Sequence, residues 1–169
     1  MSRQQARPSY SHFNANPWAA YAAAAWAFVF AANSFYWALG GTVGIETLAL
    51  TIQEEARQRD TAFLAMVWVT GGLKVLGGLL ALALARPWGR AIPRRLLLIV
   101  AWGAGVLLVL YEGASWVEAA LMEAGVIDVP ASLGADAVRW NMLLWRPWWV
   151  LGGTLFVLAA RDFGRRTHL

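Results

Sequence analysis

Four long apolar segments alternate with polar links along the chain. They occupy residues 18–39, 61–85, 96–116 and 141–160. A helix needs about 20 apolar residues to cross the hydrocarbon core of a bilayer, which is roughly the length of each segment. Their alanine and leucine runs lack the regular alternation of barrel strands. The pattern therefore predicts an all-α, four-helix transmembrane bundle at residues 17–162, between a mobile tail at 1–16 and a second tail at 163–169.

The links after the first and third segments each favour a short amphipathic helix. Gly40 and Gly41 can end the first segment, because glycine readily adopts the left-handed backbone of a helix end. Apolar residues from Ile45 to Ile52 then recur at helical spacing, which predicts a helix on the outer membrane surface.

The link after the third segment is broken at Val129-Pro130. Ser132 is expected to cap a new helix there, with Asp136 near its positive end. This helix would lead into the fourth segment, where Pro147 predicts either a kink or a fresh helix start.

Basic residues gather on one side of the predicted bundle. They precede the first segment, fill the second link and follow the fourth segment: Arg3, Arg7, Arg86, Arg90, Arg94, Arg95, Arg161, Arg165 and Arg166. Because basic flanks stay inside the cell, both termini are predicted to be cytoplasmic. A cleaved signal peptide is the alternative for the first segment, although that segment is longer than a typical signal core.

Composition supports a membrane protein. The chain is 59% hydrophobic and only 14% charged, whereas soluble domains carry about 25% charged residues. Its eleven tryptophans are typical of membrane interfaces. The net charge of +4 comes from the arginine flanks, so the expected partner is the lipid bilayer and not nucleic acid. With no cysteine, and histidines only at His12 and His168, the segments lack the usual haem and zinc ligands; no cofactor or metal is expected.

Three ionisable residues lie inside the predicted spans: Lys74, Glu112 and Arg146. Such residues are costly in a membrane and indicate a functional site. Each shares a helix face with small residues, which favour close helix packing, so all three are expected to face the interior. Glu112 and Arg146 lie at similar depth and can pair. Lys74 lies deeper and is expected to have a carboxylate partner, Glu112 first and Glu46 second, the latter only if the segment after Gly40 re-enters the bundle.

Other polar and aromatic residues are expected to line the same interior. Asn33 contributes a polar group, and tryptophans form the walls: Trp37, Trp68, Trp145 and Trp149. The result would be a bundle that is tight towards the cytoplasm and opens outward into an aromatic, partly charged cavity. The alternative is a structural role, in which the charges fix helix register and the tryptophans anchor the protein at the interface.

Three stretches resemble a known family. They are FYWALGGTVGIETL at 35–48, ARPWGRAIPRR at 85–95 and WNMLLWRPWWVLGGTLFVLAA at 140–160. They are similar to small bacterial four-helix membrane proteins catalogued only as a domain of unknown function, and the resemblance covers about residues 18–160. It implies the fold and a bacterial cytoplasmic (inner) membrane location, but no activity. At Arg146 the family pattern often carries an acidic residue, so the resemblance implies that this charge varies.

Three functions fit these patterns. The cavity would bind or help move a small amphipathic or cationic molecule, using Lys74, Glu112 and the tryptophan faces. Alternatively, the small-residue stripes would meet a partner, making the chain an accessory subunit of a larger membrane complex. A third possibility is a membrane enzyme acting on a lipid or prenyl-type substrate, with Glu112 as acid or base and Tyr111 as helper. Because four spans are few for a stand-alone transporter, a homo-oligomer or a membrane-protein partner is expected.

Overall fold

The structure is a computed structural model that describes residues 17–167, and this part of the chain is helical with no strand. The long helices are α1 (Trp18–Ala38), α3 (Thr61–Ala85), α4 (Arg94–Glu123) and α6 (Arg146–Arg166). The short elements are η1 (Ile45–Thr47), α2 (Leu50–Gln58), η2 (Pro87–Ala91), α5 (Ala135–Trp140) and a π-helical segment, η3 (Asn141–Trp145). The all-α prediction is confirmed. The predicted tail at 1–16, with His12, and the last residue pair, with His168, lie outside the described residues.

Three helices are long and apolar enough to cross a membrane. They are Thr61–Ala85, Arg94–Glu123 and the continuous run Ala135–Arg166. α1 has 21 residues but does not belong to this group. The chain is therefore an α-helical membrane protein with at least these three candidate spans.

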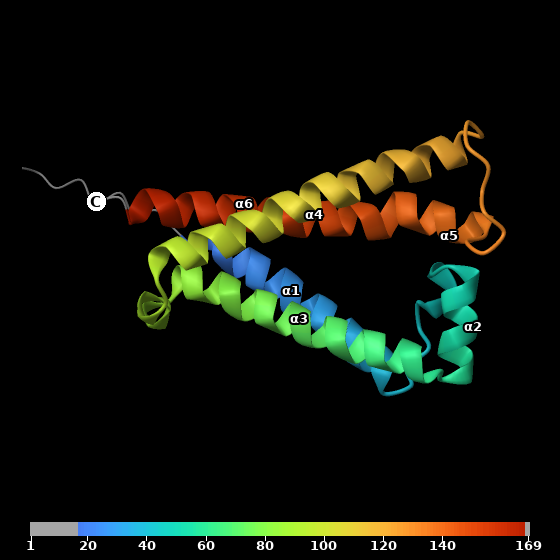
Figure 1. Ribbon diagram of the computed structural model, residues 1–169, viewed down its shortest axis with the longest axis horizontal. Helices are drawn as coiled ribbons and strands as arrows, with labels where there is room; N and C mark the ends of the chain where they lie inside the picture. Colours follow the sequence, from blue (N-terminus) through green and yellow to red (C-terminus); the bar gives the residue numbers. More distant parts are fainter. Residues whose placement is uncertain (1–16, 168–169) are drawn as a thin grey trace, which may run out of the picture.

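The long helices form two arms (Figure 1). α1 runs beside α3 in one arm, and α4 runs beside α6 in the other. The arms meet at one end, where α3 passes through η2 into α4, and diverge towards the other end, where α2 and α5 lie. This arrangement produces a closed end and an open end.

Small side chains hold the closed end together. Its buried cluster consists largely of alanines from α1, α3, α4 and α6: Ala19, Ala20, Ala83, Ala101, Ala159 and Ala160, with Leu84 and Leu97. Farther along, α4 and α6 cross at Gly105 and Gly153. A Cβ atom on either glycine would lie 2.9 Å from the carbonyl oxygen of the other, so only glycine permits this close crossing.

Several helix boundaries follow the sequence signals, and one does not. Gly40 ends α1 with a φ of 101°, as predicted. Asp60 caps α3 by accepting a hydrogen bond from the Ala62 N–H at 2.8 Å. The predicted cap at Ser132 is wrong, because α5 begins only after Gly134, whose φ is 82°, and it has no side-chain cap. α4 also runs beyond the predicted end of the third span, to Glu123, and α6 continues to Arg166, so residues 163–166 of the predicted C-terminal tail are helical.

Pro147 marks a fresh start within a continuous helical run. It lies in the first turn of α6, directly after the π-helical segment. The Arg146 N–H bonds to the Asn141 carbonyl, five residues back, and the Met142 carbonyl accepts from Trp116 Nε1 of α4 at 2.8 Å. The wider π turn rearranges the backbone hydrogen bonds where proline supplies no N–H. Trp145 ends this π-helical segment, and Arg146 begins α6.

Candidate functional site

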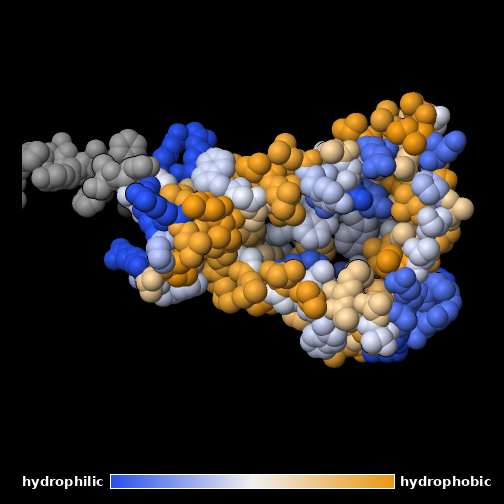
Figure 2. All heavy atoms as spheres, viewed as in Figure 1, coloured by the Kyte–Doolittle hydropathy of each residue, from blue (hydrophilic) through white to orange (hydrophobic). Residues whose placement is uncertain are grey.

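A cavity of about 400 Å³ lies between the arms near the open end. α1, α3, the η1–α2 segment and the start of α6 line it. Figure 2 shows the corresponding hollow between the two arms, with apolar surface along the arms on either side. Most of the lining is aromatic or aliphatic; the residues with polar side chains are Ser34, Thr70, Lys74, Asn141 and Arg146, along with the indole N–H groups of the tryptophans. No carboxylate belongs to this lining.

Lys74 reaches into the cavity from α3, and its partners differ from those predicted. Its Nζ donates a hydrogen bond to Ser34 Oγ at 2.7 Å and lies 3.7 Å from the centroid of the Phe30 ring. The Trp149 ring centroid is 5.5 Å away. Among the described residues Lys74 forms no ion pair, so the predicted pairing with Glu112 or Glu46 is wrong. The ammonium is stabilised instead by a hydroxyl and by aromatic faces.

Glu112 pairs with Arg146, as predicted. The distance from Arg146 Nη1 to Glu112 Oε2 is 2.6 Å, and the Glu112 side chain is only 9% exposed. Arg146 also lines the cavity. Glu112 reaches Arg146 from α4 and does not itself line the cavity. The Arg146 Nε is buried and has no hydrogen-bond partner in the described part of the chain. The pair neutralises Glu112, and Lys74 remains an uncompensated positive charge at the cavity wall.

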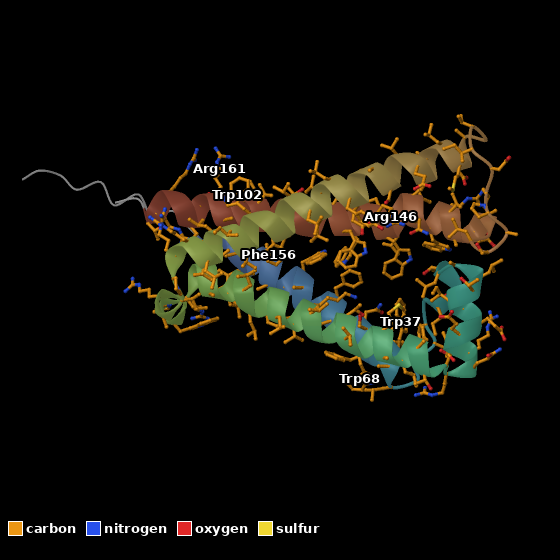
Figure 3. The ribbon with its side chains drawn as sticks, in the orientation of Figure 1. Trp37, Trp68, Trp102, Arg146, Phe156 and Arg161 are labelled. Atoms are coloured by element: carbon orange, nitrogen blue, oxygen red, sulfur yellow. The ribbon has the colours of Figure 1, made fainter. Side chains whose placement is uncertain are left out.

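Phe30 is the centre of the aromatic wall. Its ring stacks on Trp145 with centroids 6.2 Å apart and meets Trp149 edge-on at 4.5 Å. Trp145 also donates from Nε1 to Thr47 Oγ1 at 3.0 Å, which ties the loop after α1 to the start of α6. In Figure 3 the labelled side chains of Trp37 and Arg146 lie between the two arms. These contacts hold the rings in fixed positions around the Lys74 ammonium.

Besides Glu112, the structure places four candidate residues outside the cavity. Trp68 is 50% exposed and packs on Phe35 with centroids 5.4 Å apart; Figure 3 shows it pointing away from the space between the arms. Tyr111 is 64% exposed, although its neighbour Glu112 is buried. Asn33 lines a separate hollow of about 240 Å³ beside Trp148. The expectation that Trp68 and Asn33 line the same interior as Lys74 is therefore wrong.

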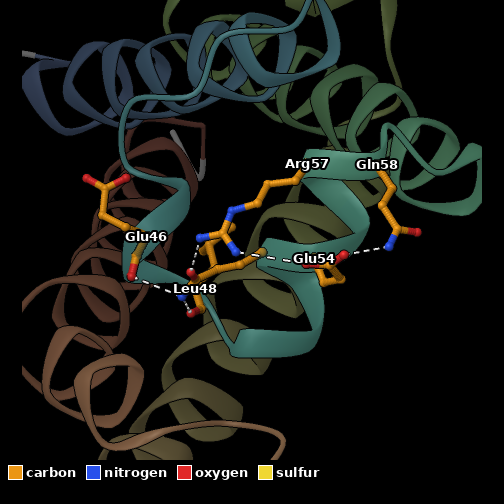
Figure 4. Close-up of polar contacts among 6 residues, drawn as sticks. Glu46, Leu48, Glu54, Arg57 and Gln58 are labelled. Atoms are coloured by element: carbon orange, nitrogen blue, oxygen red, sulfur yellow. Dashed lines mark hydrogen bonds and ion pairs between the residues drawn. The ribbon is translucent and has the colours of Figure 1, made fainter.

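Glu46, the fourth, is turned away from the bundle. The η1 segment does dip inward, because Ile45 and Thr47 are buried, but the Glu46 side chain is exposed. Its backbone carbonyl accepts from Gln53 Nε2 at 3.2 Å. Figure 4 shows this bond within the network around α2, where Gln53 also donates to the Leu48 carbonyl at 2.8 Å. The loop thus supplies the Thr47 hydroxyl, and not a carboxylate, to the interior.

A second hollow, of about 290 Å³, adjoins the first. Thr70, Lys74 and Trp149 line both. The remainder of the second hollow is apolar and lies farther towards the closed end, between α3 and α4. Two of its lining residues, Leu73 and Leu107, are 61% and 67% exposed. Lys74 therefore stands at the junction of an aromatic cavity and an apolar groove that opens on the side of the bundle.

Sequence reasoning gave too little weight to Phe30, Ser34 and Thr47. Phe30 and Ser34 are four residues apart and therefore share a helix face, which was a usable signal. For Thr47 no comparable signal exists, because its role depends on how the loop folds back. In residues 17–167 no group of three or more metal-ligating side chains gathers.

Comparison with known proteins supplies a family but no activity. The family model described as "Protein of unknown function (DUF3995)" matches residues 27–156, well over half of the chain. No curated protein and no solved structure matches. The match includes Lys74 and the Glu112–Arg146 pair, and it covers α3 and α4 entirely and parts of α1 and α6. The chain therefore belongs to the DUF3995 family of proteins of unknown function.

Proposed function

We propose that this protein crosses the membrane four times, with both ends in the cytoplasm, and binds a small amphipathic molecule in the cavity between its arms. The observation that carries the proposal is the Lys74 ammonium, which stands at an aromatic cavity wall with no carboxylate partner among the described residues. An unpaired charge within a span is costly. A ligand that contacts the ammonium would offset that cost.

The four-span arrangement rests on the packing of α1. This helix lies along α3 and also contacts α6, and its alanine face is buried. A helix packed in this way presents little surface to lipid and can span with lower hydropathy than its neighbours. The orientation rests on the closed end, where a cavity is lined by Arg86, Arg90, Arg94 and Arg166. The positive-inside rule places that end in the cytoplasm and the open end outside.

The alternatives receive less support. The accessory-subunit hypothesis requires the stripes of small residues to contact a partner protein. Instead, Gly71 and Gly78 pack on α1, and Gly105 packs on α6. For an enzyme, Glu112 was to act as acid or base, but it is tied to Arg146, and Tyr111 points away. A homo-oligomer would have to use the exposed apolar faces.

Protection of a cysteine tests the binding proposal. The chain contains no cysteine, so a single substitution reports on one position. Thr70→Cys places a thiol between the two hollows, and Val69→Cys places one on the neighbouring, 62% exposed position. In nanodiscs of zwitterionic lipid, a dodecyl-chain amphiphile should slow the reaction of Thr70→Cys with a membrane-permeant thiol reagent. The panel is dodecanoate, dodecyl phosphate, dodecyl maltoside and dodecyltrimethylammonium.

Val69→Cys is the matched control, because it has the same depth in the bilayer but lies outside both hollows. Saturable protection at Thr70→Cys alone supports the proposal, whichever amphiphile gives it. Equal effects at both positions, or no protection by any member of the panel, would refute it.

A further inference from the structure

We infer that the ligand is a single-chain amphiphile with an anionic headgroup, a carboxylate or a phosphate, held at Lys74 with its hydrocarbon chain in the apolar groove between α3 and α4. This inference rests on the proposed function and names the chemical class and position of the bound molecule.

The charge of the cavity selects the headgroup. Lys74 and Arg146 are its charged lining residues, and both are cationic. The one buried carboxylate nearby, Glu112, already neutralises Arg146 at 2.6 Å. A cationic headgroup would therefore meet uncompensated repulsion from Lys74, whereas an anion would complete an ion pair in surroundings of low dielectric.

Hydrogen-bonding capacity agrees with this choice. A lysine ammonium has three donors, and the described residues accept one of them, at Ser34 Oγ. Thr70 and Asn141 line the same cavity, but their side chains already donate to the Met66 and Ala137 carbonyls. The free donors are therefore those of the Lys74 ammonium, and a carboxylate or phosphate oxygen can accept from them. The neutral aromatic rings around Lys74 supply no comparable acceptor.

The second hollow provides the proposed binding site for the hydrocarbon chain. It adjoins the cavity at Lys74 and is otherwise lined by apolar side chains, including Leu73, Gly77 and Leu107. Because Leu73 and Leu107 are exposed on the side of the bundle, the groove opens towards the lipid phase. A lipid-derived molecule can thus enter sideways and leave its headgroup at Lys74. A free anion would use the cavity alone.

The groove offers a matched pair of glycines for testing. A Cβ on Gly77 would lie 3.7 Å from the Phe156 ring, an ordinary contact, so a larger side chain there extends into the groove. Gly72, on the same helix, has nothing within 4 Å of a Cβ and lies outside both linings. Gly77→Phe should block the chain, and Gly72→Phe should not.

The experiment compares headgroups in the Thr70→Cys protection assay, with ligand expressed as mole fraction in the nanodisc. Dodecanoate and dodecyl phosphate should protect at a mole fraction at least about tenfold lower than dodecyl maltoside or dodecyltrimethylammonium, since a charge-assisted hydrogen bond is worth that much. Lys74→Met should abolish this preference by weakening protection by the two anionic amphiphiles. Lys74→Arg should retain it, and Gly77→Phe should weaken protection by the anionic amphiphiles.

Each other outcome identifies what fails. Equal protection by all four headgroups would overturn this inference and leave the proposed function standing, whereas no protection at all would overturn both. Protection by inorganic phosphate as strong as that by dodecyl phosphate would show that the groove binds no hydrocarbon chain, and would overturn the inference that the ligand is an amphiphile. Unchanged protection by the anionic amphiphiles in Gly77→Phe would overturn it as well. Far-UV circular dichroism of each variant checks that it is folded.

Discussion

Lys74 Nζ lies 2.7 Å from Ser34 Oγ, so the single lysine of the chain is bound to a hydroxyl that is itself only 2% exposed. The contact joins the middle of α3 to α1 across the cavity wall. A buried ammonium that loses such a partner bears the cost of its own desolvation.

Removing the Ser34 hydroxyl should therefore be costly only while Lys74 is present. Ser34→Ala should lower the free energy of unfolding by about 1–3 kcal/mol, because a donor on a charged group is left unsatisfied. In the Lys74→Met background the same substitution should cost less than about 1 kcal/mol. Reversible unfolding in mixed micelles, followed by circular dichroism, measures the two values. An equal cost in both backgrounds would show that Ser34 stabilises the fold independently of Lys74.

Removing one partner of the Glu112–Arg146 pair should destabilise the protein far more than removing one partner of the more exposed Glu123–Arg139 pair. Glu112→Leu should lower the free energy of unfolding by about 3 kcal/mol, since it leaves a mostly buried guanidinium unpaired. Glu123→Leu, whose partner is 62% exposed, should cost less than about 1 kcal/mol. Adding Arg146→Met to Glu112→Leu should recover most of the loss. The same unfolding assay tests all three variants; similar losses for the two glutamates would contradict the burial argument.

Gly152 should not tolerate a methyl group. A Cβ there would overlap the indole of Trp26, which is buried and donates from Nε1 to the Trp148 carbonyl at 2.9 Å. Gly152→Ala should therefore destabilise the protein by about 1–3 kcal/mol. Gly113→Ala is the control, because a Cβ at that helical position meets nothing within 4 Å; it should stabilise by about 0.5–1 kcal/mol. Thermal unfolding in detergent measures both, and a neutral Gly152→Ala would mean that Trp26 can move aside at no cost.

The proposed topology predicts opposite labelling of two loops. Glu54→Cys, on α2, should react with a membrane-impermeant maleimide added to intact spheroplasts. Arg90→Cys, in η2, should react only after the membrane is permeabilised. Both positions are exposed on the protein surface, so a difference in their reaction with the maleimide reports the side of the membrane on which each lies. Labelling of residue 90 from outside, or protection of residue 54, would reverse or break the proposed orientation.

The sequence by itself determined the helices and many of their ends. The segment predicted at 61–85 coincides with α3, because a long apolar run with a polar residue at each end has one low-energy conformation in lipid. Gly40 and Pro147 act where expected, because their backbone limits are local properties. Helical spacing also correctly placed Lys74, Glu112 and Arg146 on inward faces, since the face of a residue depends only on its own helix.

Tertiary structure alone decided which side chains meet. Depth along the helices was enough to predict that Glu112 can pair with Arg146. Spacing along one helix does not give the rotation of its neighbour, so it could not show that Lys74 would reach Ser34 and Phe30. It also could not show that the loop after Gly40 would turn Glu46 outward and Thr47 inward. These contacts depend on how α1 packs on α3 and on how the loop after α1 meets Trp145, and both are set by packing between residues far apart in the chain.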